Sequence, residues 1–134
     1  MKLFITDTST NLSKTLITQY NIFEIPAKIC SLGQIMYHLD TFINKYKDIY
    51  YFSSDSNYET IVSMSKKILS LYSDCQITII NVDSGTIGKN NLVLKTVLSL
   101  KRCITFDSYH ASLKKIQGVS YSMIIKNNIN SLLN

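Results

Sequence analysis

The sequence has very few of the residues that interrupt regular structure or join domains. It contains one proline and four glycines among 134 residues, and no repeat or low-complexity stretch separates one part of the chain from another. Linkers between domains are usually rich in such residues. Because 46% of the residues are apolar, the chain is long enough to build one core. We therefore expect residues 1–134 to form a single domain.

Long apolar runs and paired cysteines are also missing. No run approaches the roughly 18 residues that would span a bilayer, and the N-terminus lacks the apolar core of a signal peptide. The three cysteines, Cys30, Cys75 and Cys103, are odd in number, widely spaced and form no Cys-x-x-Cys pair. The sequence thus predicts a soluble cytoplasmic protein with reduced thiols, with neither a disulfide framework nor a thiolate metal site.

Positive charge is in excess but is not concentrated. The net charge of +5 comes from 14 basic and 9 acidic residues, and the bases lie in separated doublets such as Lys66-Lys67. Nucleic-acid grooves usually carry a denser stripe, often rich in arginine, whereas Arg102 is the only arginine here. We expect no nucleic-acid partner.

Short apolar runs alternate with helical patterns along the chain. Strands are expected at 2–6, 22–29, 49–52, 76–82 and 119–125, the second of them at a sheet edge because Pro26 interrupts it. Helical patterns occupy the intervals, including 107–117, and a helical turn follows Asn127. This alternation predicts an α/β fold with three layers, in which helices flank a mostly parallel sheet of about five strands.

Two of the expected helices have distinctive features. Ser56 and Glu59 have the spacing of a capping box and predict a helix start at Ser56. The helix from Asn90 to Lys101 has little polar circumference, so it should be deeply covered or form an interface. A homodimer through this helix, or a separate partner protein, would supply the cover.

Polar clusters follow three of the expected strands. They are Asp7-Thr8-Ser9, Ser53-Ser54-Asp55-Ser56-Asn57 and Asp83-Ser84-Gly85-Thr86. In parallel sheets such ends lie at one edge, where hydroxyls and helix N-termini suit a carboxylate or phosphate. Helix capping is the alternative interpretation. The candidates for binding a small anion are Asp7, Thr8, Ser54, Ser56, Asn57 and Ser84.

Other site chemistry finds little support. The segment 85–89 has the wrong spacing for a phosphate-binding P-loop, and no Gly-x-Gly-x-x-Gly fingerprint is present. His38 and His110 lie at helix edges, which favours structural roles. Three aspartates at strand ends could meet around a divalent cation: Asp7, Asp55 and Asp83. No His or Glu accompanies them as a further ligand. We expect no catalytic residue, no metal and no cofactor.

The chain nevertheless resembles a known family. Its opening, Ile5-Thr6-Asp7-Thr8-Ser9-Thr10-Asn11-Leu12 followed by Tyr20-Asn21-Ile22 and Ile25-Pro26, resembles the opening of the DegV family of fatty-acid-binding proteins. Ser53-Ser54-x-Ser56 and Val82-Asp83-Ser84 with Gly88 resemble later DegV segments in the same order. The resemblance runs from residue 2 to about residue 101 and continues more weakly to the C-terminus.

The resemblance implies a non-catalytic lipid-binding protein. DegV proteins hold a fatty acid between two domains, with its carboxylate hydrogen-bonded by loop hydroxyls, which implies contacts at Ser54 or Ser56 and, as a remnant of another serine loop, at Ser31. The chain departs from the pattern around Ser56-Asn57-Tyr58, lacks an insertion after Pro26, and stops near the start of the C-terminal lipid-covering domain. We therefore expect the N-terminal domain alone, binding fatty acid weakly or with a partner.

Two alternatives remain open at this point. One is a scaffold or regulatory domain that kept the fold without a ligand. The other is the mannose-type phosphotransferase EIIA domain, a sister family of similar length that forms dimers. EIIA domains carry their phospho-accepting histidine directly after the first strand, where this sequence has Asp7-Thr8.

Overall fold

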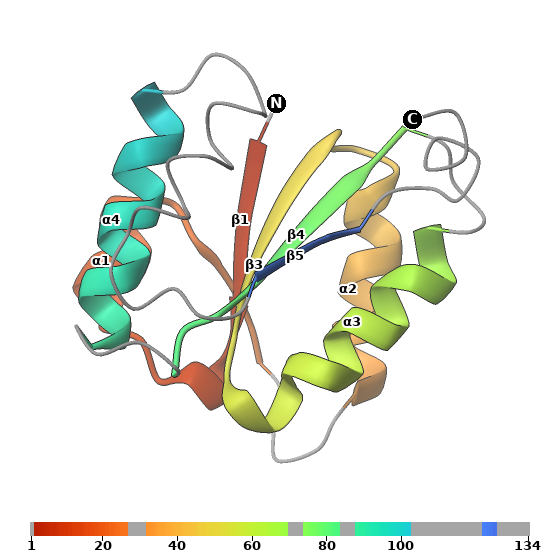
Figure 1. Ribbon diagram of the computed structural model, residues 1–134, viewed down its shortest axis with the longest axis horizontal. Coiled ribbons are helices and arrows are strands. Elements are labelled where there is room, and N and C mark those ends of the chain that lie inside the picture. The colour runs from red at the N-terminus through yellow and green to blue at the C-terminus, as the bar shows by residue number, and fades with distance from the viewer. Residues whose placement is uncertain (1, 27–31, 70–73, 84–87, 103–121, 126–134) are drawn as a thin grey trace.

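The computed structural model describes residues 2–26, 32–69, 74–83, 88–102 and 122–125. Its helices and strands form three layers (Figure 1): α1 and α4 cover one face of a central sheet, and α2 and α3 cover the other. The predicted α/β fold is confirmed.

The sheet has five strands in the order β2-β1-β3-β4-β5. The first four are parallel, and β5 pairs antiparallel to β4. Their bounds are β1 Lys2–Asp7, β2 Phe23–Ile25, β3 Asp48–Ser53, β4 Gln76–Asn81 and β5 Ser122–Ile125. Because β1, β3 and β4 are parallel neighbours, their carboxyl ends line one edge of the sheet.

The helices begin and end close to the expected positions. They are the 3-10 turn η1 Thr8–Thr10, α1 Lys14–Gln19, α2 Leu32–Ile43, α3 Asp55–Leu69 and α4 Lys89–Arg102. The helix expected at 107–117 and the turn after Asn127 lie outside the described residues.

Two local expectations need correction. Strand β2 has only three residues and ends before Pro26, which has no N–H with which to extend a ladder. Its place at the sheet edge is confirmed. The capping box is wrong, because α3 begins at Asp55 and the Ser54 carbonyl accepts the first N–H bonds, so that Ser56 and Glu59 lie inside the helix.

The core lies on both faces of the sheet because side chains alternate along each strand. In β3, Ile49 and Tyr51 pack under α2 and α3, whereas Tyr50 and Phe52 pack under α1 and α4. All four side chains are buried. Within the described residues, no helix is both long and apolar enough to cross a membrane.

Helix α4 is amphipathic. Leu92, Val93 and Val97 are buried against the sheet, whereas Asn90 and Lys95 are exposed. The expectation that this helix has little polar circumference is therefore wrong. A homodimer through it stays a prediction.

Two leucines of α4 form a matched test of this packing. Leu92→Ala should lower the free energy of unfolding by about 2–5 kcal/mol, because it leaves a cavity at a fully buried site. Leu98 is 38% exposed, and Leu98→Ala should cost less than about 1 kcal/mol. Urea denaturation measures both. Equal losses would show that the outer face of α4 is covered in solution.

Candidate functional site

A buried carboxylate lies at the carboxyl end of β1. Asp7 is fully buried, and its Oδ1 accepts hydrogen bonds from the N–H of Ser9, at 2.9 Å, and from the Ser9 hydroxyl. The hydroxyl of Tyr51 donates to Oδ2 at 2.5 Å. Burial of a charge is tolerated when hydrogen bonds compensate it, and three donors do so here.

Tyr51 reaches Asp7 across the β1–β3 ladder, where Ile5 pairs with Tyr51. Burial, the negative charge of Asp7 and the hydrogen bond to it raise the pKa of Tyr51 well above its ordinary value. The phenol therefore stays protonated at neutral pH and acts as a donor.

A network of hydroxyls extends from Asp7 to the surface. The Oγ atoms of Ser9 and Ser54 are 2.9 Å apart, and those of Ser54 and Ser56 are 3.1 Å apart. The side-chain amide of Asn57 donates to Ser9 Oγ at 3.1 Å. We call Asp7, Ser9, Ser54, Ser56 and Asn57 the serine network.

The parallel sheet brings these residues together. Ser9 and Ser54 are 45 positions apart in the sequence, but η1 follows β1, α3 follows β3, and the two strands are neighbours. Of the predicted site residues, Asp7, Ser54, Ser56 and Asn57 meet in this network.

The remaining predicted residues are placed differently. Thr8 lies in η1, between Asp7 and Ser9, and its side chain is exposed. Ser31 and Ser84 lie outside the described residues.

Threonines hold the turn that carries Ser9. Thr6 Oγ1 donates to the carbonyl of Phe52 at 2.9 Å, and Thr10 Oγ1 donates to the carbonyl of Asp7 at 2.9 Å. Asn11 ends the turn with φ 49°, a left-handed conformation that asparagine tolerates. The polar sequence after β1 thus fixes the backbone as well as the network.

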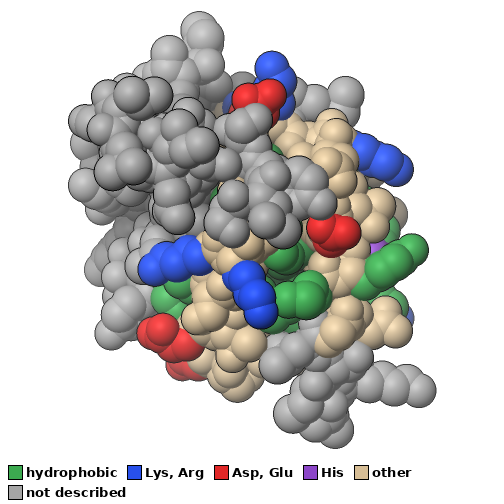
Figure 2. Space-filling view, turned by 90° about the vertical axis from the view of Figure 1, so that its right-hand side faces the viewer, with side chains coloured by type: hydrophobic (Ala, Val, Ile, Leu, Met, Phe, Trp, Pro, Cys, Tyr) green, Lys and Arg blue, Asp and Glu red, His purple; other side chains and the backbone are tan. Residues whose placement is uncertain are grey.

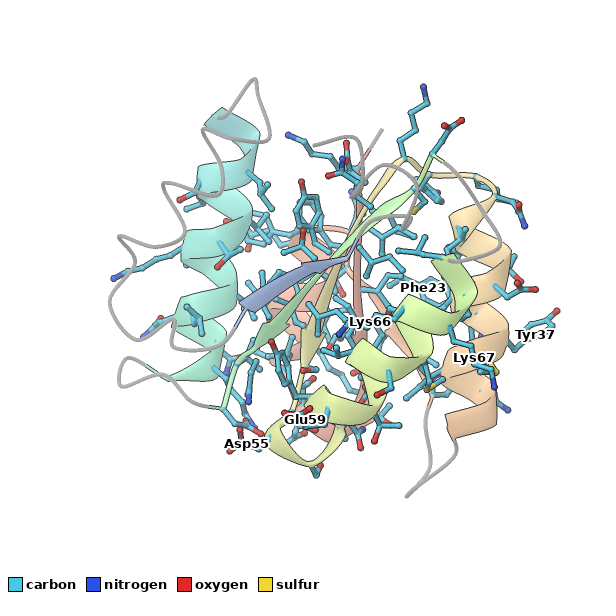
Figure 3. All side chains as sticks on the ribbon, turned by 45° about the vertical axis from the view of Figure 1, so that its right-hand side comes forward. Phe23, Tyr37, Asp55, Glu59, Lys66 and Lys67 are labelled. Atoms are coloured by element: carbon cyan, nitrogen blue, oxygen red, sulfur yellow. The ribbon has the colours of Figure 1, made fainter. Side chains whose placement is uncertain are left out.

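A second polar cluster lies beside the first. Asp83 Oδ2 accepts the backbone N–H of Asp55 at 3.0 Å, and Asn81 donates to Asp55 Oδ1 at 2.5 Å. Figure 3 shows Asp55 and Glu59 at the beginning of α3. Asp55 and Asp83 are therefore in contact with each other, whereas the carboxylate of Asp7 is hydrogen-bonded within the serine network. Among the described residues, no group of three or more His, Cys, Asp or Glu could hold a metal ion.

The network runs from the core to the surface. Asp7 and Ser54 are buried, Asn57 is half-buried, and Ser9 and Ser56 are exposed. Ser56 is therefore its outer end. Ser9 was not among the predicted site residues, although it stands in the polar cluster after the first strand. Tyr51 was not predicted either, because its role depends on the pairing of β1 with β3.

Surface hollows occur elsewhere. A groove of about 450 Å³ lies between α2 and α3, lined by Gly33, Met36, Tyr37, Asp40, Lys67 and Ile68. Figure 2 looks onto this side of the molecule and shows hydrophobic side chains reaching the surface among charged ones. A hollow of about 280 Å³ includes Tyr46 and Cys75. Neither hollow is lined by a residue of the serine network.

His38 has a structural setting. Its ring lies 5.3 Å from that of Phe23 and 6.0 Å from that of Phe42, centre to centre. This packing agrees with the structural role expected for His38, and His110 lies outside the described residues.

Comparison with known proteins places the fold. No protein-family model matches the chain, and no curated protein matches it. A solved structure of a fatty acid (stearic acid)-binding protein from Eubacterium ventriosum matches with a TM-score of 0.69 at 14% identity. A fatty-acid-binding DegV family protein from Thermus thermophilus matches with a TM-score of 0.60 at 10% identity. The fold is similar to that of DegV proteins.

Both matches cover 85% of this chain but 52% of the other, so the chain spans about half the length of the structures it resembles. At these identities the likeness shows the DegV-like fold alone. The resemblance in fold that the sequence motifs indicated is confirmed.

The bond from Tyr51 to Asp7 can be tested by Tyr51→Phe. This change removes one of three donors to a buried carboxylate and should lower the free energy of unfolding by about 1–3 kcal/mol at pH 7. The control is Tyr37→Phe, at a ring that is 69% exposed, which should change stability by less than about 0.5 kcal/mol. Urea denaturation compares the two. Equal stabilities would show that the bond contributes nothing.

The raised pKa of Tyr51 also predicts an alkaline loss of stability. Above about pH 10 the tyrosine of the unfolded chain releases its proton while the folded one keeps it, so the free energy of unfolding falls as pH rises. Tyr51→Phe should make this fall shallower, by up to about 1.4 kcal/mol per pH unit. Denaturation at pH 9 and pH 11 measures the slope. Identical slopes in both proteins would contradict the assignment.

Proposed function

We propose that this chain is a non-catalytic lipid-binding domain, formed by residues 1–134, that holds the head group of an acyl ligand at the serine network. The observation that carries the proposal is the convergence of Ser9, Ser54 and Ser56 at the carboxyl edge of a parallel sheet. Both matched structures are of fatty-acid-binding proteins, which supports an acyl ligand.

The position of the network supports binding of a polar head group. Ligands of open α/β sheets bind beyond the carboxyl ends of the strands. Ser56 lies in the first turn of α3, where backbone N–H groups have no partner within the helix and the helix dipole is positive. Ser56 is exposed, so a head group can reach it.

The chemistry of Asp7 supports a binding role without catalysis. Its carboxylate is buried and already accepts three hydrogen bonds, from Ser9 and Tyr51. A general base needs an accessible lone pair directed at its substrate. Asp7 therefore forms the floor of the site.

The acyl chain needs cover from outside the residues described here. Each buried methylene contributes about 0.8 kcal/mol, so a long acyl chain left in water loses most of its binding free energy. The α2–α3 groove and the hollow near Cys75 have no lining residue in common with the serine network. A second copy through α4, or a separate partner, would supply the missing wall, and binding by the isolated chain would be weak.

The cellular location belongs to the same proposal. Cys75 is a free, buried thiol, and such a thiol needs no oxidising compartment. This favours the cytoplasm.

A scaffold or regulatory domain without ligand is the second candidate. Each hydroxyl of the serine network already has a partner within the chain, as expected of a purely structural network. Phosphotransfer of the EIIA type has less support, because Asp7 ends β1, Thr8 follows it where a histidine would be needed, and Asp7 is buried.

Native mass spectrometry of the purified chain, beside organic extraction, tests for a co-purifying acyl chain and gives the oligomeric state. We expect bound lipid whose occupancy falls at least about tenfold in Ser56→Ala, as loss of a head-group hydrogen bond predicts. It should also fall in Ser54→Ala, which removes the partner that orients the Ser56 hydroxyl. Ser63→Ala is the matched control, since Ser63 is an exposed serine of the same helix.

Either of two results would contradict the proposal. One is a chain that purifies empty and takes up neither an added fatty acid, oleate or palmitate, nor an added neutral lipid, oleyl alcohol, which would favour the scaffold. The other is bound lipid whose occupancy is the same in all three serine variants, which would place the ligand elsewhere.

A further inference from the structure

The serine network has a direction that Asp7 imposes. An ionised carboxylate can only accept hydrogen bonds, so the single hydroxyl proton of Ser9 is committed to Asp7 Oδ1. Ser9 Oγ must then accept from its two other neighbours. These are the hydroxyl of Ser54, at 2.9 Å, and the amide of Asn57, at 3.1 Å.

The donors and acceptors of Ser54, Ser56 and Asn57 follow from this direction. Ser54 donates its proton to Ser9, so the 3.1 Å bond between Ser54 and Ser56 has Ser56 as donor. Asn57 must turn its NH₂ group toward Ser9 and its carbonyl oxygen away. Every hydroxyl proton of the network therefore points toward Asp7.

The outer end of the serine network, at Ser56 and Asn57, therefore offers mainly hydrogen-bond acceptors. Within the part of the chain that the structure describes, Ser56 Oγ and Asn57 Oδ1 accept no hydrogen bond. The donors beside them are the second amide N–H of Asn57 and the backbone N–H of Ser56. Asp55 and Asp83, both exposed, add negative charge near the beginning of α3. A carboxylate meets acceptors and like charge here.

We infer that the network selects a neutral acyl head group that donates a hydrogen bond, such as an alcohol or a primary amide, over a carboxylate. The inference rests on the proposed function and specifies its ligand. Such a head group adds a bond at Ser56 and removes none. A carboxylate must turn the Ser56 hydroxyl outward and break its bond to Ser54.

The residues of the network then have distinct roles. Asp7 determines specificity, because its charge sets the direction of all three hydroxyls. Tyr51 is a positioning residue, because it holds the second oxygen of Asp7. One hydrogen bond gained or lost corresponds to about tenfold in affinity.

The test compares oleyl alcohol, oleamide and oleate, delivered from cyclodextrin at pH 8, for binding to the whole chain by native mass spectrometry. The three share one acyl chain, so differences report the head group. We expect the alcohol and the amide to bind at least about fivefold more tightly than oleate. Oleate binding as tightly or more tightly would overturn the inference and leave the proposed function standing. Binding of none of the three would overturn both.

Substitutions test whether the serine network causes the preference for a neutral head group. Asp7→Asn removes the charge and leaves a neutral, weaker acceptor, so the Ser9 hydroxyl is held inward less strongly and the ratio of affinities should move toward oleate by at least about tenfold. Asp74→Asn makes the same charge change at an exposed site before β4, at the opposite edge of the sheet, and should leave the ratio unchanged.

Circular dichroism checks that the Asp7 variant folds. Ser56→Ala keeps Asp7 and removes the outer acceptor, so it should abolish the preference for the alcohol even if Asp7→Asn does not fold. An unchanged ratio in Ser56→Ala and in a folded Asp7→Asn would overturn the assignment.

Discussion

The hydrogen bonds that hold the buried carboxylate of Asp7 are the constraint on which the carboxyl edge depends. A buried charge without partners costs several kcal/mol, so the chain must deliver donors to it. The parallel pairing of β1 with β3 delivers Tyr51, and the turn after β1 delivers Ser9. Displacing β3 by one residue would turn Tyr51 to the other face of the sheet, and displacing β1 by one residue would turn Asp7 away in the same manner. The register of β1 and β3 therefore determines the geometry of the site.

Much of this edge could be predicted from the sequence. Alternation of strands and helices predicts a parallel sheet, and a parallel sheet brings its strand ends together, which is how Asp7, Ser54, Ser56 and Asn57 come to meet. That part of the prediction needs only the order of elements. It does not need the register, and it is not affected by errors of a few residues in the boundaries.

The parts that failed depend on contacts between distant segments. Ser54 and Ser56 both suit a helix N-cap locally, and the Ser54 carbonyl takes that role only because β3 extends to Ser53. The part played by Tyr51 follows from its pairing with Ile5, which no local pattern contains. Helix α4 was expected to have little polar circumference, yet Lys95 and Asn90 lie exposed on its outer face.

The hydroxyl protons that stabilise the buried Asp7 are the same protons that a ligand carboxylate would need. The DegV resemblance predicts serines that donate to a carboxylate, and the serines are present. In this chain their protons are directed inward by Asp7, beneath Ser9, Ser54 and Ser56. A hydroxyl has only one proton to donate, so a serine that donates toward Asp7 cannot also donate to a ligand anion. A fold that satisfies Asp7 with these hydroxyls therefore weakens its own affinity for a carboxylate, and the ligand that disturbs the fold least brings a proton of its own.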